Sequence, residues 1–254
     1  MTVVVAHKWA PNPQEATVAP GGTVDLSRAK PAVSEYDPVA IEVGRRLADA
    51  WGCELVGVSV GGPEIAAPMA RKAALSRGLD RLVVVADERL SGAGATPTAV
   101  ALAQAVGEVE DVRVVLAGDS SVDEGAHLVP SVLAGLLGWP SLAEVADVTA
   151  DGGALVVERA QGSGSQVVRV DGPAVLAVAA DAAVPRVAGM KDILAAGKKP
   201  VVELPLAGEL PAQPEVVGRA PVPLAERGRR RIDTTDPDAA ARELVAALRA
   251  DGVL

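Results

Sequence analysis

The sequence predicts an α/β fold built on a doubly wound, mostly parallel sheet of the Rossmann-like kind. Four short valine-rich runs alternate with segments of helical spacing along the first half of the chain. Near-continuous valine without polar alternation is typical of strands covered on both faces, as in a parallel sheet. Alternating strands and helices then favour the doubly wound arrangement. The expected strands are Val3–Lys8, Glu54–Val60, Arg81–Ala86 and Val112–Gly118.

A helix is expected between the first two strands, within DPVAIEVGRRLADAWG. Its apolar residues recur at helical spacing, and its charged residues fall on the other sides. Pro38 suits a first helical turn behind Asp37 as the N-cap, and Gly52 follows the end. The residues that mark the start and end of a helix therefore agree with the helical spacing of the apolar residues.

After Pro140 the alternation of expected strands and helices gives way to short strand-like pieces. Three strand-like pieces, ALVVERA, SQVVRV and AVLAVAA, are separated by Asp-Gly-Gly, Gly-Ser-Gly and Asp-Gly-Pro. These separators are turn residues, so we expect an appended β-meander attached to the main sheet.

Beyond Lys199 the chain becomes rich in proline, which favours an extended arm over helix or central strand. The arm is expected to end in a helix that Asp236 caps and Pro237 opens. We therefore divide the chain into an α/β domain, residues 1–200, and an arm with its helix, residues 201–254. The helix has a narrow apolar stripe that could pack on its own domain or on another subunit; it comprises Ala240, Leu244, Val245 and Leu248.

Composition excludes several classes of protein. The net charge is −9, with one Tyr, three Trp and no Phe, so the chain lacks the basic and aromatic surface of a nucleic-acid-binding protein. No run of about 20 apolar residues occurs, so we expect no membrane insertion. The single cysteine, Cys53, cannot form an internal disulfide and is expected in the core. Because the N-terminus also lacks a secretory signal, the expected location is cytoplasmic.

Three loops after expected strands are candidates for a ligand site, because ligands of open α/β sheets bind beyond the carboxyl ends of the strands. They are HKWAPNP, SVGGPE and GDSSVDEGAH. None of them has the glycine spacing of a dinucleotide fingerprint or the Gly-Lys-Ser/Thr of a P-loop.

No catalytic or metal-binding constellation is expected. His7 and His127 have no metal-ligand spacing to each other, and there is no second cysteine. The carboxylates Asp119, Asp123 and Glu124 share one loop, where helix capping by Asp123 or Glu124 is the favoured interpretation. No nucleophile-elbow pattern surrounds the nearby serines.

Residues 173–200, PAVLAVAADAAVPRVAGMKDILAAGKKP, resemble the β (small) subunit of electron transfer flavoproteins. The likeness extends over essentially the whole chain. It includes the first strand VVVAHKW, the stretch SEYDPVAIEVGRRL with Tyr36 and Asp37 kept, ALSRGLDRLVVV, and the terminal TTDPDAAARELVAALRADGVL.

The resemblance implies an adenine nucleotide hydrolase-like fold and a carrier without substrate chemistry of its own. Such proteins are αβ heterodimers that take electrons from flavin dehydrogenases to a quinone-linked or similar acceptor. Their FAD is held mainly by the α subunit, and the β subunit of many members also binds AMP. The terminal helix packs on the α subunit in this family, which favours the intersubunit contact over packing on its own domain.

The resemblance also implies roles for particular residues. VPRVAGMKDILAAGKKP corresponds to a recognition loop that docks on dehydrogenases, with Met190 as its apolar anchor; the alternative is that Met190 only fills the core. The expected docking residues are Pro185, Arg186, Met190, Ile193 and Leu194. The expected cofactor-binding residues are Ala6, His7, Lys8, Tyr36, Asp37, Val60, Ser121, Asp123, Gly125, Ala126, His127 and Val129.

The loop GDSSVDEGAHLVP departs from the family pattern and puts AMP in doubt. Glu124 replaces a glycine and would repel a phosphate, and Leu128 replaces a glutamine that could hydrogen-bond. Pro130 replaces a glycine and removes an amide donor from the helix start. We therefore expect AMP binding to be weak, absent or replaced by another ligand.

Two other functions remain open on the sequence. One is a free-standing adenine-nucleotide-binding domain, against which the proline-rich arm and the recognition loop argue. The other is a bifurcating flavoprotein subunit with a second FAD, which Glu124 and Leu128 disfavour because a dinucleotide needs a roomy phosphate loop.

Overall fold

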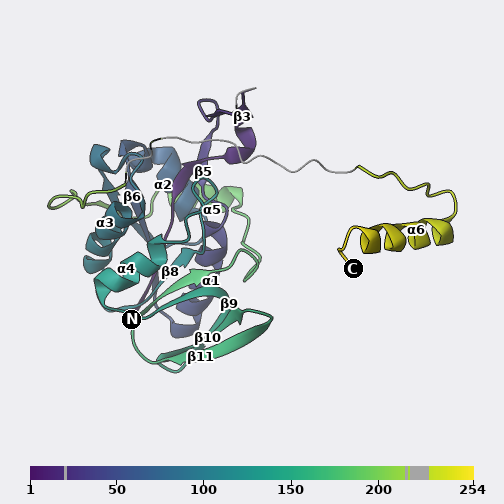
Figure 1. Ribbon diagram of the computed structural model, residues 1–254. Coiled ribbons are helices and arrows are strands. Elements are labelled where there is room, and N and C mark those ends of the chain that lie inside the picture. Colours follow the sequence, from purple (N-terminus) through teal and green to yellow (C-terminus); the bar gives the residue numbers. More distant parts are fainter. Residues whose placement is uncertain (20–21, 215–216, 218–228) are drawn as a thin grey trace. The chain divides into compact units, whose positions relative to one another are not determined.

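The computed structural model describes residues 1–19, 22–214, 217 and 229–254 (Figure 1). The chain divides into a larger unit, Met1–Gly218, and a smaller one, Arg219–Leu254. Each unit has its own secondary structure.

The larger unit contains a nine-stranded sheet in the order β11-β10-β9-β12-β8-β1-β6-β7-β13. Neighbouring strands are parallel throughout, except for the β9–β10 and β10–β11 pairs. The expected doubly wound, mostly parallel sheet is therefore confirmed. The strands are β1 (Thr2–Ala6), β6 (Glu54–Gly61), β7 (Arg81–Ala86), β8 (Val112–Gly118), β9 (Ser141–Asp151), β10 (Ala154–Gln161), β11 (Gly164–Val170), β12 (Ala174–Val178) and β13 (Val201–Glu203).

Helices cover both faces of the sheet (Figure 1). Helices α1 (Asp37–Trp51), α2 (Pro68–Leu75) and α5 (Met190–Ala196) pack on one face, and α3 (Ala95–Gly107) and α4 (Val129–Leu137) on the other. Val3, Val4 and Val5 are completely buried because alternate residues of β1 meet opposite helical layers. This double burial is why the strands are valine-rich without alternation.

Short elements fill several connections. Between β1 and α1, β2 (Trp9–Pro11) pairs with β5 (Pro31–Val33), and β3 (Thr17–Val18) pairs with β4 (Val24–Asp25). The 3₁₀ turns are η1 (Pro13–Glu15), η2 (Pro63–Ala66) and η3 (Glu88–Leu90).

Helix α1 lies unusually close to the sheet at Gly44. A Cβ atom at this position would lie 2.8 Å from Val5 Cγ2 and 2.9 Å from Leu55 Cδ1. The missing side chain therefore lets the backbone of α1 rest directly on β1 and β6. Cys53, after this helix, is partly buried against the same core, as expected.

The predicted N-cap of α1 is wrong. Asp37 is the first helical residue, and the cap position is Tyr36, which makes no side-chain capping bond. The Asp37 carboxylate instead accepts hydrogen bonds from the backbone N–H groups of Lys8 and Gly118. Gly52 ends the helix at φ 63°, as expected from its sequence position.

The predicted meander is correct only in part. β9, β10 and β11 form an antiparallel meander, but β9 was not foreseen, because few of its residues are buried and its apolar pattern is weak. Residues 174–178, expected in the meander, form β12, which lies between β9 and β8 and pairs parallel with both. All five residues of β12 are buried, which is the pattern of a central strand.

The first residues of the expected arm are part of the larger unit. β13 pairs parallel with β7 at the edge of the sheet, and Leu206 is buried on the α3 face. Gln104 of α3 binds the backbone of Pro205 and Ala207 through both ends of its side-chain amide. The middle of the expected arm, residues 218–228, lies outside the described residues. The division of the chain at residue 200 into an α/β domain and an arm stays a prediction.

The smaller unit contains α6 (Pro237–Ala250). The Asp236 carboxylate accepts from the N–H groups of Asp238 and Ala239, so the predicted cap and helix start are confirmed. Within residues 229–254, the α6 side chains of Leu244 and Val245 are exposed. Over the ranges described in both units, no helix has the length and apolar character needed to cross a bilayer.

The contact at Gly44 gives a direct test of how α1 packs. Gly44→Ala should lower the free energy of unfolding by about 1–3 kcal/mol, because the new Cβ overlaps Val5 and Leu55. Gly135→Ala on α4 is the matched control, since nothing lies within 4 Å of its Cβ position; helix propensity predicts about 0.5–1 kcal/mol of added stability there. Denaturant unfolding measures both, and equal effects would contradict the close approach.

Candidate functional site

The candidate site lies where the strand order reverses. From β1 the chain proceeds to β6 and β7 on one side, and then crosses to β8 and β12 on the other. The segments after β1 and β8 lead to helices on opposite faces, α1 and α4. In this class of sheet, the crevice between such diverging loops is the usual place for a ligand. Two of the three expected candidate loops, those after β1 and β8, therefore meet at this point.

The Asp37 carboxylate joins the ends of the two strands. Oδ2 accepts from the Lys8 N–H at 2.7 Å, and Oδ1 accepts from the Gly118 N–H at 3.3 Å. Burial raises the pKa of Asp37 to about 7, although the two N–H donors and the Lys8 charge act in the opposite direction. Asp37 thus satisfies backbone amides that diverging loops would otherwise leave unpaired.

A lysine and an aspartate close the same crevice. Lys8 Nζ lies 2.7 Å from Asp123 Oδ2, so the loops after β1 and β8 are joined by an ion pair. Burial acts to raise the pKa of Asp123, but the hydrogen bond and charge of Lys8, followed by Ser121, lower the pKa on balance. The predicted capping by Asp123 or Glu124 is wrong, because α4 starts at Val129 with Leu128 at the cap position.

The two histidines have different environments. His7 is buried, and burial lowers its pKa to about 4, so the imidazole is neutral near pH 7; its Nδ1 has no hydrogen-bond partner. Its ring lies near Gly57 on the α1 and α2 face of the sheet. His127 is exposed at a positive φ of 54°, with Nδ1 3.5 Å from Asp119 Oδ2.

The remaining expected cofactor residues have different neighbours. Gly125, at φ 59°, donates its N–H to the Ser121 carbonyl, within the loop that also holds Ala126. Val60 of β6 packs against the α3 and α4 side of the core, as does Val129. The structure thus joins Lys8, Asp37, Ser121 and Asp123 by hydrogen bonds, while their cofactor roles stay predictions. Ala6 is buried at the end of β1, and Tyr36 is partly buried at the start of α1.

Two residues that organise the crevice were missed. Buried Ser34 donates its N–H to the Lys8 carbonyl, and its Oγ accepts from the Val122 N–H at 3.4 Å. Gly118 supplies the amide that binds Asp37. The place of Gly118 at the end of a predicted strand was an available signal, whereas nothing near Ser34 in the sequence indicates its partner on another loop.

The expected docking residues form an exposed segment at another place on the larger unit. Met190 is the first residue of α5 and is 73% exposed, so the alternative that it fills the core is wrong. Leu194 and Ile193 of the same helix are also exposed. Pro185 is partly buried, and Arg186 forms an ion pair with Glu42 of α1. Val184 and Val187 were missed, and their side chains are 85% and 93% exposed.

The pKa of Asp37 predicts a dependence of stability on pH. Its pKa in the folded state, about 7, lies above the ordinary value of 3.8, so the folded protein retains a proton that the unfolded chain has lost. Between these two values the free energy of unfolding should fall as pH rises, by up to about 1.4 kcal/mol per pH unit from this group. In Asp37→Asn, urea unfolding at a series of pH values should show a shallower slope over this window. Equal slopes in the two proteins would contradict a raised pKa.

The family model for the electron transfer flavoprotein domain matches residues 22–208. The matched range includes α1, the loop after β8, the meander and the segment that carries Met190. Proteins with this domain bind flavin and act as electron carriers, together with a partner subunit and redox partners. Because the match covers well over half of the chain, the protein belongs to the electron transfer flavoprotein family.

Proposed function

We propose that this chain is the β (small) subunit of a heterodimeric electron transfer flavoprotein. In this role it carries electrons from flavin dehydrogenases to a quinone-linked or similar acceptor, with FAD held mainly by the α subunit. The observation that carries the proposal is the exposed apolar segment around Met190 within the matched domain. A reducing cytoplasm suits the lone Cys53, and electron carriage requires no acid–base residue of the chain.

The docking surface proposed here consists of Val184, Val187, Met190, Ile193 and Leu194. Met190 and Leu194 are one helical turn apart on α5 and therefore share a face. A group of exposed apolar side chains on a water-facing surface is typical of a protein interaction site. Methionine adds a flexible, polarisable contact that can adapt to more than one dehydrogenase.

The smaller unit supports the assignment to a heterodimer. Within residues 229–254, the α6 helix carries exposed Leu244 and Val245 along one stripe. Such a stripe gains stability by covering its apolar side chains. We propose that the α subunit provides that cover.

The crevice after β1 and β8 supports the proposal that AMP is bound weakly or not at all. Lys8 is already paired with Asp123, so its charge is neutralised by the protein itself. Pro130 lies in the first turn of α4, where it removes one of the amide donors that a phosphate would need. The exposed Leu128 at the cap position offers no side-chain hydrogen bond. These features also disfavour a nucleotide-sensing domain and a second FAD.

Met190→Ala tests the docking role. A complex carrying this substitution should be reduced more slowly by a flavin dehydrogenase at subsaturating carrier, because a buried apolar contact in the encounter is lost. Losing an apolar contact of this size should raise KM about tenfold and leave kcat unchanged. Stopped-flow reduction of the bound flavin is the measurement.

The control is Val167→Ala, which shortens an exposed apolar side chain on β11 outside the docking surface. It should leave the rate unchanged. Flavin content and subunit assembly should be unaffected in both variants. A Met190→Ala complex that is reduced at the wild-type rate would contradict Met190 as the anchor.

The nucleotide proposal has its own test. Protein purified without added nucleotide and denatured with acid should release no stoichiometric AMP, as measured by chromatography of the supernatant. A sample mixed with a known amount of AMP before extraction checks the recovery. Release of one AMP per chain would refute the account of Leu128, Pro130 and the Lys8–Asp123 pair.

A further inference from the structure

The first part of the docking surface is held by few contacts. Among the residues that the structure describes, the only hydrogen bonds of residues 183–188 are those of Arg186. Val184 and Val187 are exposed, so apolar burial of their side chains does not fix the segment. A hollow of about 300 Å³ is lined by both valines and by residues of α1, α5 and the α2–β7 turn. Ala183 packs against the core and Pro185 is half-buried, and beyond these contacts the position of the segment depends on Arg186.

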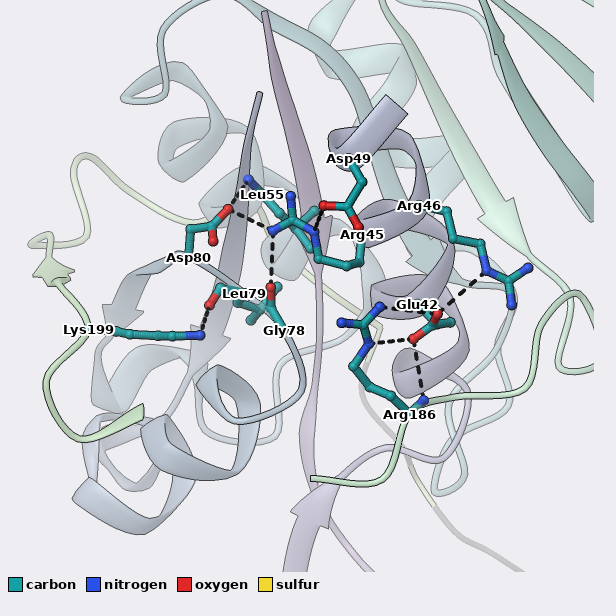
Figure 2. A network of polar contacts seen from close by, with 10 residues as sticks. All are labelled: Glu42, Arg45, Arg46, Asp49, Leu55, Gly78, Leu79, Asp80, Arg186 and Lys199. Atoms are coloured by element: carbon teal, nitrogen blue, oxygen red, sulfur yellow. Dashed lines mark hydrogen bonds and ion pairs between the residues drawn. The ribbon is translucent and has the colours of Figure 1, made fainter. Parts of the chain in front are cut away.

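Arg186 is bound by a single carboxylate (Figure 2). Its Nε lies 2.7 Å from Glu42 Oε2, and its Nη2 lies 3.3 Å from Oε1. The backbone N–H of Arg186 donates to the same Oε2 at 3.3 Å. Both carboxylate oxygens of Glu42 are thus bound, by the guanidinium group and the backbone N–H of Arg186. This is the geometry of a strong, directional ion pair. We call these contacts the Glu42–Arg186 clasp.

Glu42 is a rigid base for the clasp. It lies in the middle of α1, half a turn from the point where Gly44 places this helix directly on the sheet. Its side chain is only 11% exposed, so it would be a poorly solvated charge without a partner. The hydrogen bond from Arg186 is the main cause of a lowered pKa at Glu42, and Arg46 gives a second, longer contact of 3.5 Å.

The opposite wall of the clasp is the α2–β7 turn. Gly78 of this turn has φ 113°, and the Arg186 side chain passes 3.6 Å from the position that its Cβ would occupy. Arg45 holds the turn by donating to Asp80 at 2.9 Å, and Asp80 in turn accepts from the Leu55 N–H (Figure 2). Lys199, which follows α5, donates to the Leu79 carbonyl. Arg186 therefore lies between two fixed walls.

We propose that the Glu42–Arg186 clasp holds the docking surface in the conformation that a flavin dehydrogenase binds, which makes Glu42 a positioning residue for docking. This inference rests on the docking function proposed above. Glu42 is covered and lies beneath the segment, so a substitution there acts on docking through Arg186. The partially exposed Arg186, by contrast, could touch a dehydrogenase directly, and its substitution alone would not separate the two roles.

Glu42→Gln in the complex with the partner subunit is the test. Hydrogen–deuterium exchange of the Arg186 amide, followed within residues 184–189, should become about tenfold faster or more, because its charge-assisted hydrogen bond to Glu42 is lost. Reduction of the flavin by a dehydrogenase that reduces the wild-type complex should show a KM raised by a similar factor, with kcat and flavin content unchanged. Trypsin cleavage after Arg186, measured by mass spectrometry, should also become faster, because Glu42 no longer holds the segment. It is an independent measure of the same loosening.

Asp49→Asn is the matched control. Asp49 is an exposed carboxylate on the same helix, pairs with Arg45 at 2.8 Å and takes no part in the hydrogen bonds that bind Arg186. It should change neither the exchange of residues 184–189 nor KM. Arg186→Lys keeps the charge but loses the planar fork, so it should give the same changes to a smaller degree. If Glu42→Gln fails to fold, the exchange of residues 184–189 in Arg186→Lys still tests the clasp, because that measurement involves no dehydrogenase.

Two results would overturn the proposal: unchanged exchange of residues 184–189 in Glu42→Gln, or faster exchange with an unchanged KM. A third result separates the clasp from the docking function. If no flavin dehydrogenase reduces the wild-type complex while Glu42→Gln still frees the segment, the docking function fails and the positioning role falls with it. The clasp itself would then stand as a structural contact.

Discussion

The Asp37 carboxylate satisfies two backbone amides where the strand order reverses, between β1 and β8, whose chains lead to helices on opposite faces of the sheet. The hydrogen bonds between the parallel strands end at this point. A buried backbone N–H without an acceptor there would destabilise the fold. Placing the carboxylate at the first residue of α1 ties this helix to both strands. The close approach at Gly44 then fixes the rest of α1 against the sheet. The geometry of the crevice follows from these two contacts, since Lys8 and its partner Asp123 extend from the same strand ends.

The same helix connects the crevice to the docking surface. Its first residue, Asp37, organises the ends of β1 and β8, and its middle, at Glu42, holds Arg186. The two regions have opposite needs. The crevice is closed by charges that neutralise each other, whereas the docking surface leaves apolar side chains open to a partner. This division suits a carrier, because electron transfer requires a docked partner and a nearby flavin rather than a reactive side chain.

Patterns that depend on neighbouring residues could be predicted from the sequence, and contacts between distant residues could not. The valine runs identified β1, β6, β7 and β8 because burial on both faces selects one residue type along a strand. Asp236 was identified as a cap because its partners follow directly in the chain. Asp37 has the same sequence context before a proline, yet its true partners lie at the ends of two strands. Glu42 and Arg186 are 144 positions apart, so no local signal reveals their pairing, and the half-exposed β9 lacks a clear apolar pattern.

The most direct measurement is a native mass spectrum of this chain co-expressed with a candidate α subunit. We predict a heterodimer that carries one FAD and no AMP. A monomer or homodimer that holds an adenine nucleotide and ignores the candidate partner would contradict the assignment as an electron transfer flavoprotein subunit.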